Sequence, residues 1–305
     1  MARAKSTSTT GPRSKSTSAA AAPKASRASA SSPAIEPPGR LSEVRPWLAA
    51  HAADPRALAA LAWAPRRRAA THDACLRALL KLGGAAALDA LATYRGQDAG
   101  SLNELGDAWD DFDRCAFARR VLASPVTLVA RGGLARLDGV ECVESLDTLW
   151  VHVADRCSLE PLRGCPELIS LSVWCEGDID LTPAAALPAL DRLVIHGQKL
   201  GPSVLEPLRP ARVGQLDLEL GPGVDLGSLA GLARLRQLKL ATARPALAPH
   251  ELEALRGLVG RGAIVRGFTH QPWTVALGQV GGQLRESHGH RDVFDPELNP
   301  GGLFN

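Results

Sequence analysis

The residues that could do chemistry lie in one recurring sequence pattern. The segments LWVHV, LSVWC, LVIHG and LDLEL each place a ring or a carboxylate between apolar residues. Histidine can ligate a metal or exchange protons near neutral pH, and tryptophan supplies a large, rigid contact area. The residues concerned are Trp150, His152, Trp174, His196, Asp217 and Glu219.

Two further groups of polar residues could bind a cation. One is an acidic cluster around Trp109 and Phe112, formed by Asp107, Asp110, Asp111 and Asp113. It lacks the D-x-D-x-D-G spacing of a calcium loop, so helix capping and a solvated acidic surface are predicted instead. The other is His288-Gly-His290 with Asp292, which could bind a transition metal adventitiously but is more typical of a solvated, Gly-rich loop.

The cysteines show no C-x-x-C pair. They are scattered along the chain, at Cys75, Cys115, Cys142, Cys157, Cys165 and Cys175. This spacing suits neither a disulfide framework nor a zinc site, so free thiols in a reducing compartment are expected and no metal site is predicted.

Sequence motifs of catalysis are absent. The chain has no G-x-S-x-G elbow, no H-E-x-x-H and no dinucleotide-type G-x-G-x-x-G, and the Gly-rich run at 257–262 has the wrong spacing. We therefore predict a protein that is not an enzyme, with no catalytic residue, no cofactor and no small-molecule substrate.

The elements that position the polar residues follow from a repeat. The segments LDTLWVHV, LISLSVWC, LDRLVIHG, VGQLDLEL and LRQLKLAT align, and their shared leucines are separated by 22, 22, 23 and 22 residues. Those anchors are Leu149, Leu171, Leu193, Leu216 and Leu238. A fixed period of this length is typical of a solenoid.

Each repeat combines two periodicities. In LEPLRGCPELISLSVW (159–174) apolar residues recur every three positions and then every two. The first spacing predicts an extended or 3₁₀-like segment, and the second predicts a short strand. Stacking the repeats would pair each strand with the next and bury the leucines in one continuous core.

This pattern resembles the leucine-rich repeats of the 22-residue, bacterial or SDS22-like kind, over roughly residues 125–268. The resemblance implies an α/β leucine-rich repeat solenoid with a parallel sheet on its concave face. The chain departs from the family where an asparagine is usual, at Ala154, Glu176, Gln198, Gly221 and Ala243, so no asparagine ladder can support the turns.

A second resemblance lies upstream. AWDDFDRCAFARRVLA (108–123) is similar to the segment before the repeats in some bacterial NACHT-type NTPases with leucine-rich repeats. Such an NTPase needs a P-loop ending in Gly-Lys-Ser/Thr, and the dipeptide Gly-Lys does not occur in this chain. The resemblance therefore implies only the sensing half of such a protein.

Strand register predicts which polar residues meet. Side chains between the leucines should form columns on the concave face, with strands about 4.8 Å apart. One column would read Trp150, Ser172, Val194, Asp217 and Lys239, and the next His152, Trp174, His196, Glu219 and Ala241. His152 and His196 would be two strands apart, about 10 Å, which is too far to share a metal ion.

We therefore predict a protein-binding surface at Trp150, His152, Trp174 and His196, extending to Asp217 and Glu219. Tryptophan is enriched among binding hot spots. The alternative is that the tryptophans pack against the N-terminal helices or against each other.

Composition divides the chain into four parts. Residues 1–40 are rich in Ala, Ser, Lys and Arg and carry a net charge of +6, which leaves −3 for the rest of a chain whose total is +3. We expect a disordered tail at 1–40, a helical N-terminal subdomain at 41–124, the solenoid at 125–268 and a C-terminal cap and tail at 269–305.

The tail leaves several functions open. Beyond solubility, it could be a transit peptide, an arm for nucleic acid, or a leader like those of bacterial type III effectors. No apolar run is long enough for a membrane span, no secretory signal is present, and the body is not basic. We expect a bacterial cytoplasmic protein that binds another protein, with nucleic acid and membranes not among its partners.

Overall fold

The computed structural model describes residues 38, 40–64, 69–93, 104–105, 107–122, 127–242, 244–268 and 283–285. The chain divides into two units, Met1–Ala34 and Ile35–Asn305, and every described residue belongs to the second. Almost all of the predicted tail (1–40), together with His288, His290 and Asp292, lies outside the described residues.

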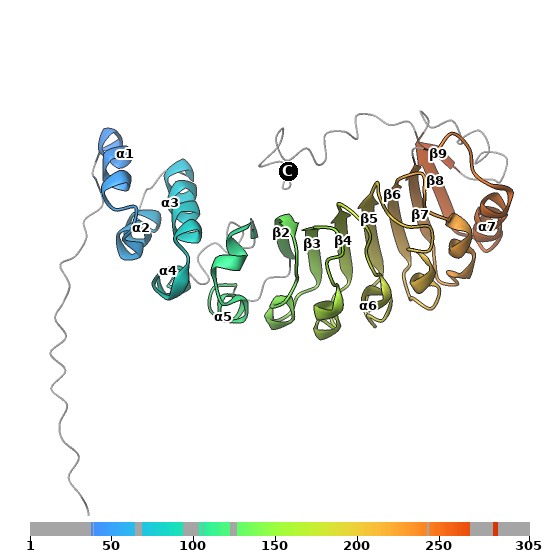
Figure 1. Cartoon of the computed structure of the whole chain (residues 1–305), viewed down its shortest axis with the longest axis horizontal. Coiled ribbons are helices and arrows are strands. Elements are labelled where there is room, and N and C mark those ends of the chain that lie inside the picture. The colour runs from blue at the N-terminus through green and yellow to red at the C-terminus, as the bar shows by residue number, and fades with distance from the viewer. Residues whose placement is uncertain are drawn as a thin grey trace, which may run out of the picture. The chain divides into compact units, whose positions relative to one another are not determined.

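The N-terminal part is helical, as the sequence predicts (Figure 1). Asp54 caps the second helix by accepting hydrogen bonds from the backbone N–H groups of Arg56 and Ala57 at 3.0 and 3.3 Å. Gly83 separates the third and fourth helices and Gly84 begins the fourth, and both have positive φ, a conformation that favours glycine. The helices are α1 (Leu41–Ala50), α2 (Pro55–Ala62), α3 (Ala69–Leu82) and α4 (Gly84–Ala92).

The next described segment begins the sheet. Glu104 and Leu105 form a short strand, β1, which pairs in parallel with Val129 and Ala130. A 3₁₀ turn, η2 (Asp107–Asp111), and a helix, α5 (Arg114–Arg120), follow, and Asp113 caps α5 at Ala116 as expected.

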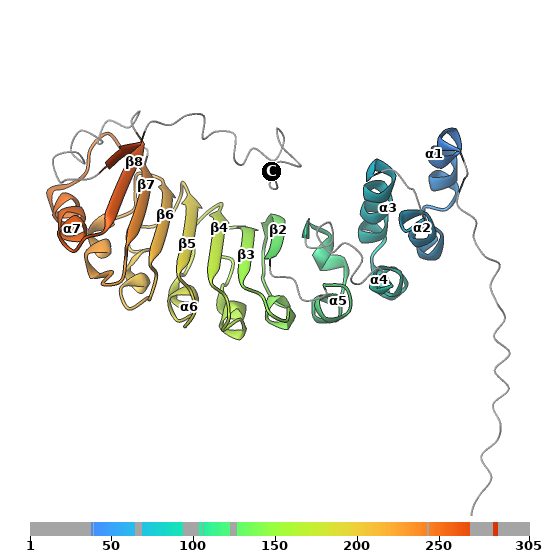
Figure 2. The same ribbon diagram turned by 180° about the vertical axis from the view of Figure 1, so that it is seen from behind.

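The rest of the described chain is a solenoid. Nine strands form one sheet in sequence order, and every neighbouring pair is parallel (Figures 1 and 2). After β1 these are β2 (Thr127–Leu134), β3 (Thr148–Val153), β4 (Ser170–Cys175), β5 (Arg192–Gly197), β6 (Gln215–Leu220), β7 (Gln237–Thr242), β8 (Ile264–Phe268) and β9 (Gln283–Arg285). Pairing thus begins upstream of residue 125 and continues beyond 268.

Short helical segments return the chain from one strand to the next on one side of the sheet. They are η3 (Val140–Cys142), η4 (Glu160–Gly164), α6 (Thr182–Ala185), η5 (Glu206–Leu208), η6 (Leu226–Gly231) and α7 (Pro249–Gly260). Among the described residues, no helix is both long and apolar enough to span a bilayer.

The two periodicities of each repeat have a direct backbone cause. Leu162 donates its N–H to Leu159, Cys165 to Leu162, and Leu168 to Cys165, at 2.9, 2.8 and 3.1 Å. These successive i to i−3 bonds turn every third side chain inward, and Leu171 then continues the core from strand β4. The chain is therefore an α/β leucine-rich repeat solenoid, with its leucines in a single buried cluster.

Aspartates one or two residues after the family's usual asparagine position support two of the turns. Asp155 accepts the N–H of Asp178 at 2.9 Å, and Asp178 accepts the N–H of Gly201 at 3.3 Å. Each carboxylate thus satisfies a backbone donor in the next repeat. Gly177 lies beneath this ladder, and a Cβ there would collide with the Asp155 carboxylate.

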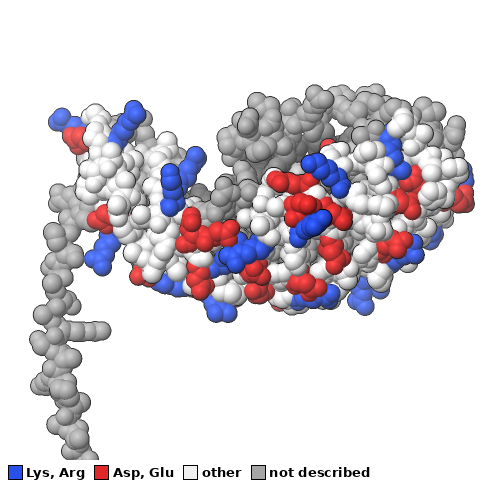
Figure 3. Space-filling model, viewed as in Figure 1, with Lys and Arg blue, Asp and Glu red and all other residues white. Residues whose placement is uncertain are grey.

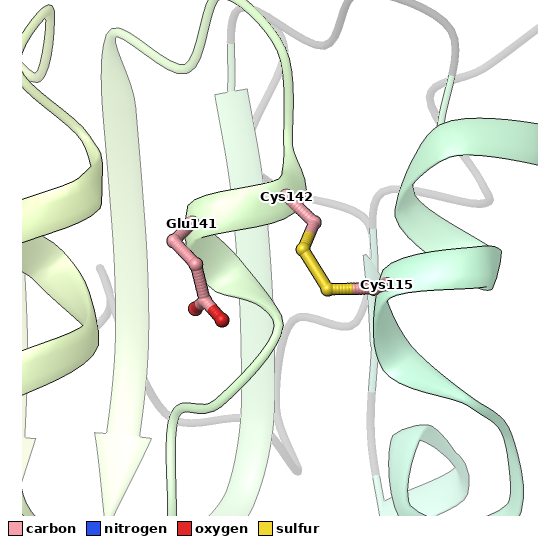
Figure 4. Close-up of side chains that lie close together, drawn as sticks. All are labelled: Cys115, Glu141 and Cys142. Carbon is pink, nitrogen blue, oxygen red and sulfur yellow. A yellow bond between two sulfur atoms is a disulfide. The ribbon is translucent and has the colours of Figure 1, made fainter.

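One prediction about the cysteines is wrong. Cys115 of α5 and Cys142 of η3 form a disulfide, with Cα atoms 5.2 Å apart (Figure 4). The spacing of the two residues in sequence, 27, gave no sign of this, because the contact is made by packing α5 against the first repeat. Among the described residues the free thiols are buried, at Cys75, Cys157, Cys165 and Cys175.

Candidate functional site

The six predicted site residues share one surface, which we call the open face. It consists of the side chains of β3 to β7 that point away from the leucine core. Register places Trp150 beside Ser172, Val194, Asp217 and Lys239, and His152 beside Trp174, His196, Glu219 and Ala241. Both columns are those that the repeat alignment predicts.

Three rings on the open face form a stack. The Trp150 and Trp174 rings have centroids 6.1 Å apart, and the Trp174 and His196 rings lie 4.4 Å apart and parallel to within 2°. All three residues are half-buried. The tryptophans thus pack against each other, as the alternative interpretation expected, and remain partly accessible. Such ring pairs contribute about 0.5–1.5 kcal/mol to stability beyond the burial of their area. This attraction favours the stacked orientation of the rings.

Each histidine faces a carboxylate in the neighbouring repeat. His196 Nδ1 lies 2.9 Å from Glu219 Oε2, and His152 Nε2 lies 3.3 Å from Glu176 Oε1. Glu219 and Glu176 are more than half exposed, at 56% and 54% of the side chain. The two imidazoles therefore point to different carboxylate partners.

The remaining predicted residue, Asp217, pairs with Lys239 at 3.0 Å, and both side chains are about one quarter exposed. This pair continues the open face beyond the ring stack. Opposite charges one strand apart fix both side chains, and a surface pair of this kind contributes little to stability. The arrangement supplies oriented donors and acceptors next to flat rings.

Among the described residues, two other groups bring possible metal ligands together. In one of them, Glu251 is only 1% exposed and accepts hydrogen bonds from Arg244 and from the N–H groups of Leu226 and Ala248. These donors fasten α7 to η6, and so does the contact of His250 Nε2 with Asp225 Oδ1 at 2.9 Å. The other group, around Cys115 and Cys142, is considered below.

The acidic cluster has the structural role that the sequence predicts. Asp110 contacts Arg114 at 2.6 Å and Arg136 at 3.2 Å, and Asp113 caps α5. Burial works to raise the pKa of Asp110, but the guanidinium groups of Arg114 and Arg136 hold it below its ordinary value. Trp109 and Phe112 are buried beneath the cluster.

Sequence reasoning missed the partners of two predicted site residues, Glu176 beside His152 and Lys239 beside Asp217. Glu176 follows β4 and occupies a turn position where the family favours asparagine, so it was considered only as an irregularity. Lys239 lies in the predicted column, but its charge was not paired with Asp217. A search for opposite charges one repeat apart, or one repeat plus two residues, would have found both pairs.

Comparison with known proteins adds little. No family model matches the chain, and no curated protein matches it. One solved structure with a likeness is an internalin from Listeria monocytogenes, with 19% identity and a TM-score of 0.38. The match covers 56% of this chain and 50% of the internalin, so this chain spans half of that protein's length.

Proposed function

We propose that this chain is a non-catalytic repeat protein that binds another protein through the open face. The observation that supports this most is the ring stack of Trp150, Trp174 and His196 on the open face. Polar pairs at His152–Glu176 and Asp217–Lys239 flank the stack. Aromatic anchors within a polar rim are typical of protein-binding surfaces.

The rigidity of the open face favours this function. Its side chains stand on six-residue strands in unbroken register from β3 to β7. A partner would therefore meet groups that are already oriented, so binding would order few side chains. The chain also carries no catalytic motif, and we propose that its function requires none.

We further propose that the repeats are of the 22-residue, SDS22-like class, on the basis of their spacing. The similarity of residues 108–123 to the segment before the repeats of bacterial NACHT-type proteins supports a role as a sensing or scaffolding part. Without a Gly-Lys dipeptide, such a role does not include NTP hydrolysis by this chain.

A charge-reversal experiment tests the open face. We would immobilise the protein and compare partners captured by wild type, Glu219→Arg and Glu206→Arg. The two glutamates are matched in exposure, at 56% and 54%, but Glu206 lies on η5, away from the open face. We expect a partner that Glu206→Arg retains and Glu219→Arg loses. Equal capture by both variants would contradict the proposed site.

For location we propose the cytoplasm of a bacterium. A rival proposal is an effector whose residues 1–40 direct delivery into another cell. Deleting residues 1–40 separates the two, because a passive tail leaves secretion unchanged and a delivery signal does not.

A second rival proposal is that the basic tail, residues 1–40, binds nucleic acid. On the face shown in Figure 3, acidic and basic side chains of the described residues are interspersed, which does not favour a phosphate-binding surface there. Binding to nucleic acid that weakens steeply with salt, and disappears when residues 1–40 are deleted, would support this rival over the protein-binding proposal.

A further inference from the structure

The disulfide lies beside a third group that can ligate a metal. Glu141 and Cys142 extend from the same short helix, η3, while Cys115 reaches across from α5 (Figure 4). One ligand atom from each of the three residues lies within 4.8 Å of the others. We propose that, once the disulfide is reduced, Cys115, Cys142 and Glu141 form a surface site for a thiophilic divalent cation of the zinc class.

The geometry of the two reduced cysteines suits such an ion. Two thiolates at about 2.3 Å from a tetrahedral Zn²⁺ lie about 3.8 Å apart, which a pair of cysteines with Cα atoms 5.2 Å apart can reach by side-chain rotation. A carboxylate oxygen completes three protein ligands, and water can take the fourth position. Two sulfurs and one oxygen favour zinc over calcium or magnesium, which prefer oxygen ligands.

The two cysteines stay together without their covalent bond, because Arg114 fastens α5 to the first repeat. Its Nη1 donates to the carbonyls of Arg136 and Asp138 at 2.9 and 3.1 Å, and Nη2 contacts Asp110. Arg114 is only 6% exposed, and Gly139 gives it room because a Cβ there would clash with it. Reduction therefore leaves a preorganised dithiol.

The carboxylate is held in place as well. Glu141 Oε2 accepts the N–H of Gly139 at 2.9 Å, which limits the rotation of the side chain. Outer contacts of this kind orient metal ligands and strengthen binding. Glu141 is exposed and both cysteines are half-buried, so an ion can enter from solvent. The four free cysteines are buried, which leaves them far less accessible.

One neighbouring charge opposes the ion. Arg119 Nη2 lies 3.9 Å from Cys142 Sγ and would repel a divalent cation while stabilising a thiolate without metal. The site thus has two states. A dithiol reductant gives two electrons to the disulfide and becomes a disulfide itself, leaving two thiols on the protein. Binding of M²⁺ then releases both thiol protons.

Cobalt titration of the full chain tests the site. We would reduce the protein with a dithiol, remove the reductant without air, and add Co²⁺ as a spectroscopic stand-in for Zn²⁺. The expected result is one Co²⁺ per chain with a thiolate-to-cobalt charge-transfer band, reversed by Zn²⁺. The oxidised protein should give no band. An equal band in both states would overturn the proposal.

Variants assign the ligands. Cys142→Ser should abolish the band, whereas Glu141→Gln keeps the disulfide-forming pair and should weaken Co²⁺ binding roughly tenfold or more. Glu144→Gln, an exposed acid just beyond η3, is the matched control and should bind like wild type. Arg119→Gln should bind more tightly. An undiminished band in the double variant Cys115→Ser/Cys142→Ser, or wild-type affinity in Glu141→Gln, would overturn the assignment.

Discussion

At the scale of single residues, Asp155 and Asp178 carry a role that asparagine usually has in such repeats. Each accepts a backbone N–H from the following repeat through one carboxylate oxygen. An asparagine has an acceptor oxygen in the same place, whereas alanine leaves the donor without its partner. The bond, and not the charge, is what the turn requires.

We therefore expect Asp155→Ala to lower the free energy of unfolding by about 0.5–1.5 kcal/mol, the range of an ordinary hydrogen bond, because this bond is exposed to water. Asp155→Asn keeps the acceptor and should change the free energy of unfolding by less than about 0.5 kcal/mol. Urea unfolding of both variants beside wild type measures the difference. If the two variants were equally destabilised, the carboxylate charge would matter more than the hydrogen bond.

The lowered pKa values of three other aspartates make the free energy of unfolding depend on pH. Hydrogen bonds from Thr182 lower the pKa of Asp180, and the backbone N–H of Gly227 lowers that of Asp225 despite burial. For Asp110, burial acts in the opposite direction, but the neighbouring arginines lower the pKa on balance. All three start from an ordinary value of 3.8.

A carboxyl group whose pKa is lower in the folded chain binds protons more tightly when unfolded. Its contribution to stability is present above the ordinary pKa and is lost as pH falls through the lowered value. We expect the free energy of unfolding to decrease from about pH 5 to pH 3, and less steeply in Asp180→Asn/Asp225→Asn. An identical slope in wild type and the double variant would show that these carboxylates are not responsible.

The site residues were predictable only in part. The leucine period fixed which side chains share a column, so the positions of Trp150, Trp174 and His196 on one face followed from sequence. Their stacking and the pairing of His152 with Glu176 did not, because both depend on side-chain rotation across strands. Register can be read from a repeat, but rotamers cannot.

At the scale of elements, the disulfide joins α5 to η3. Closing a loop across 27 residues restricts the unfolded chain, and the loop-entropy relation gives about 3–4 kcal/mol of stabilisation. We expect the free energy of unfolding of oxidised wild type to exceed that of Cys142→Ser by roughly that amount. Guanidinium unfolding measures it, with reduced wild type as the control.

The measurement on reduced wild type decides whether the bond itself is responsible. Reduced wild type should match Cys142→Ser, because both lack the bond but retain the Arg114 contacts. If oxidised and reduced wild type unfolded at the same denaturant concentration, the disulfide would contribute nothing to stability.

Elements differ in how well sequence predicts them. The start of α5 follows from the cap at Asp113, since a cap acts within its own turn. The strand β1 did not follow, because Glu104 and Leu105 become a strand by pairing with β2. The same holds for the disulfide, whose partners meet only when two elements pack.

At the scale of the whole molecule, the solenoid predicts a mixed spectrum. Every described strand pairs in parallel with its neighbours, and helices lie before and between the strands. Circular dichroism should show both helix and strand. A spectrum dominated by helix with negligible strand would contradict the fold.

The central claim is that the open face binds a protein partner through its tryptophans. The direct measurement is the affinity of Trp150→Ala and Trp174→Ala for a partner captured by wild type, beside melting curves of both variants. We expect binding to weaken by about 2 kcal/mol or more. Stability should fall by less than the cost of truncating a core aromatic, because both rings are only half-buried. Unchanged affinity, or a stability loss of about 3–5 kcal/mol typical of a core aromatic, would contradict the account.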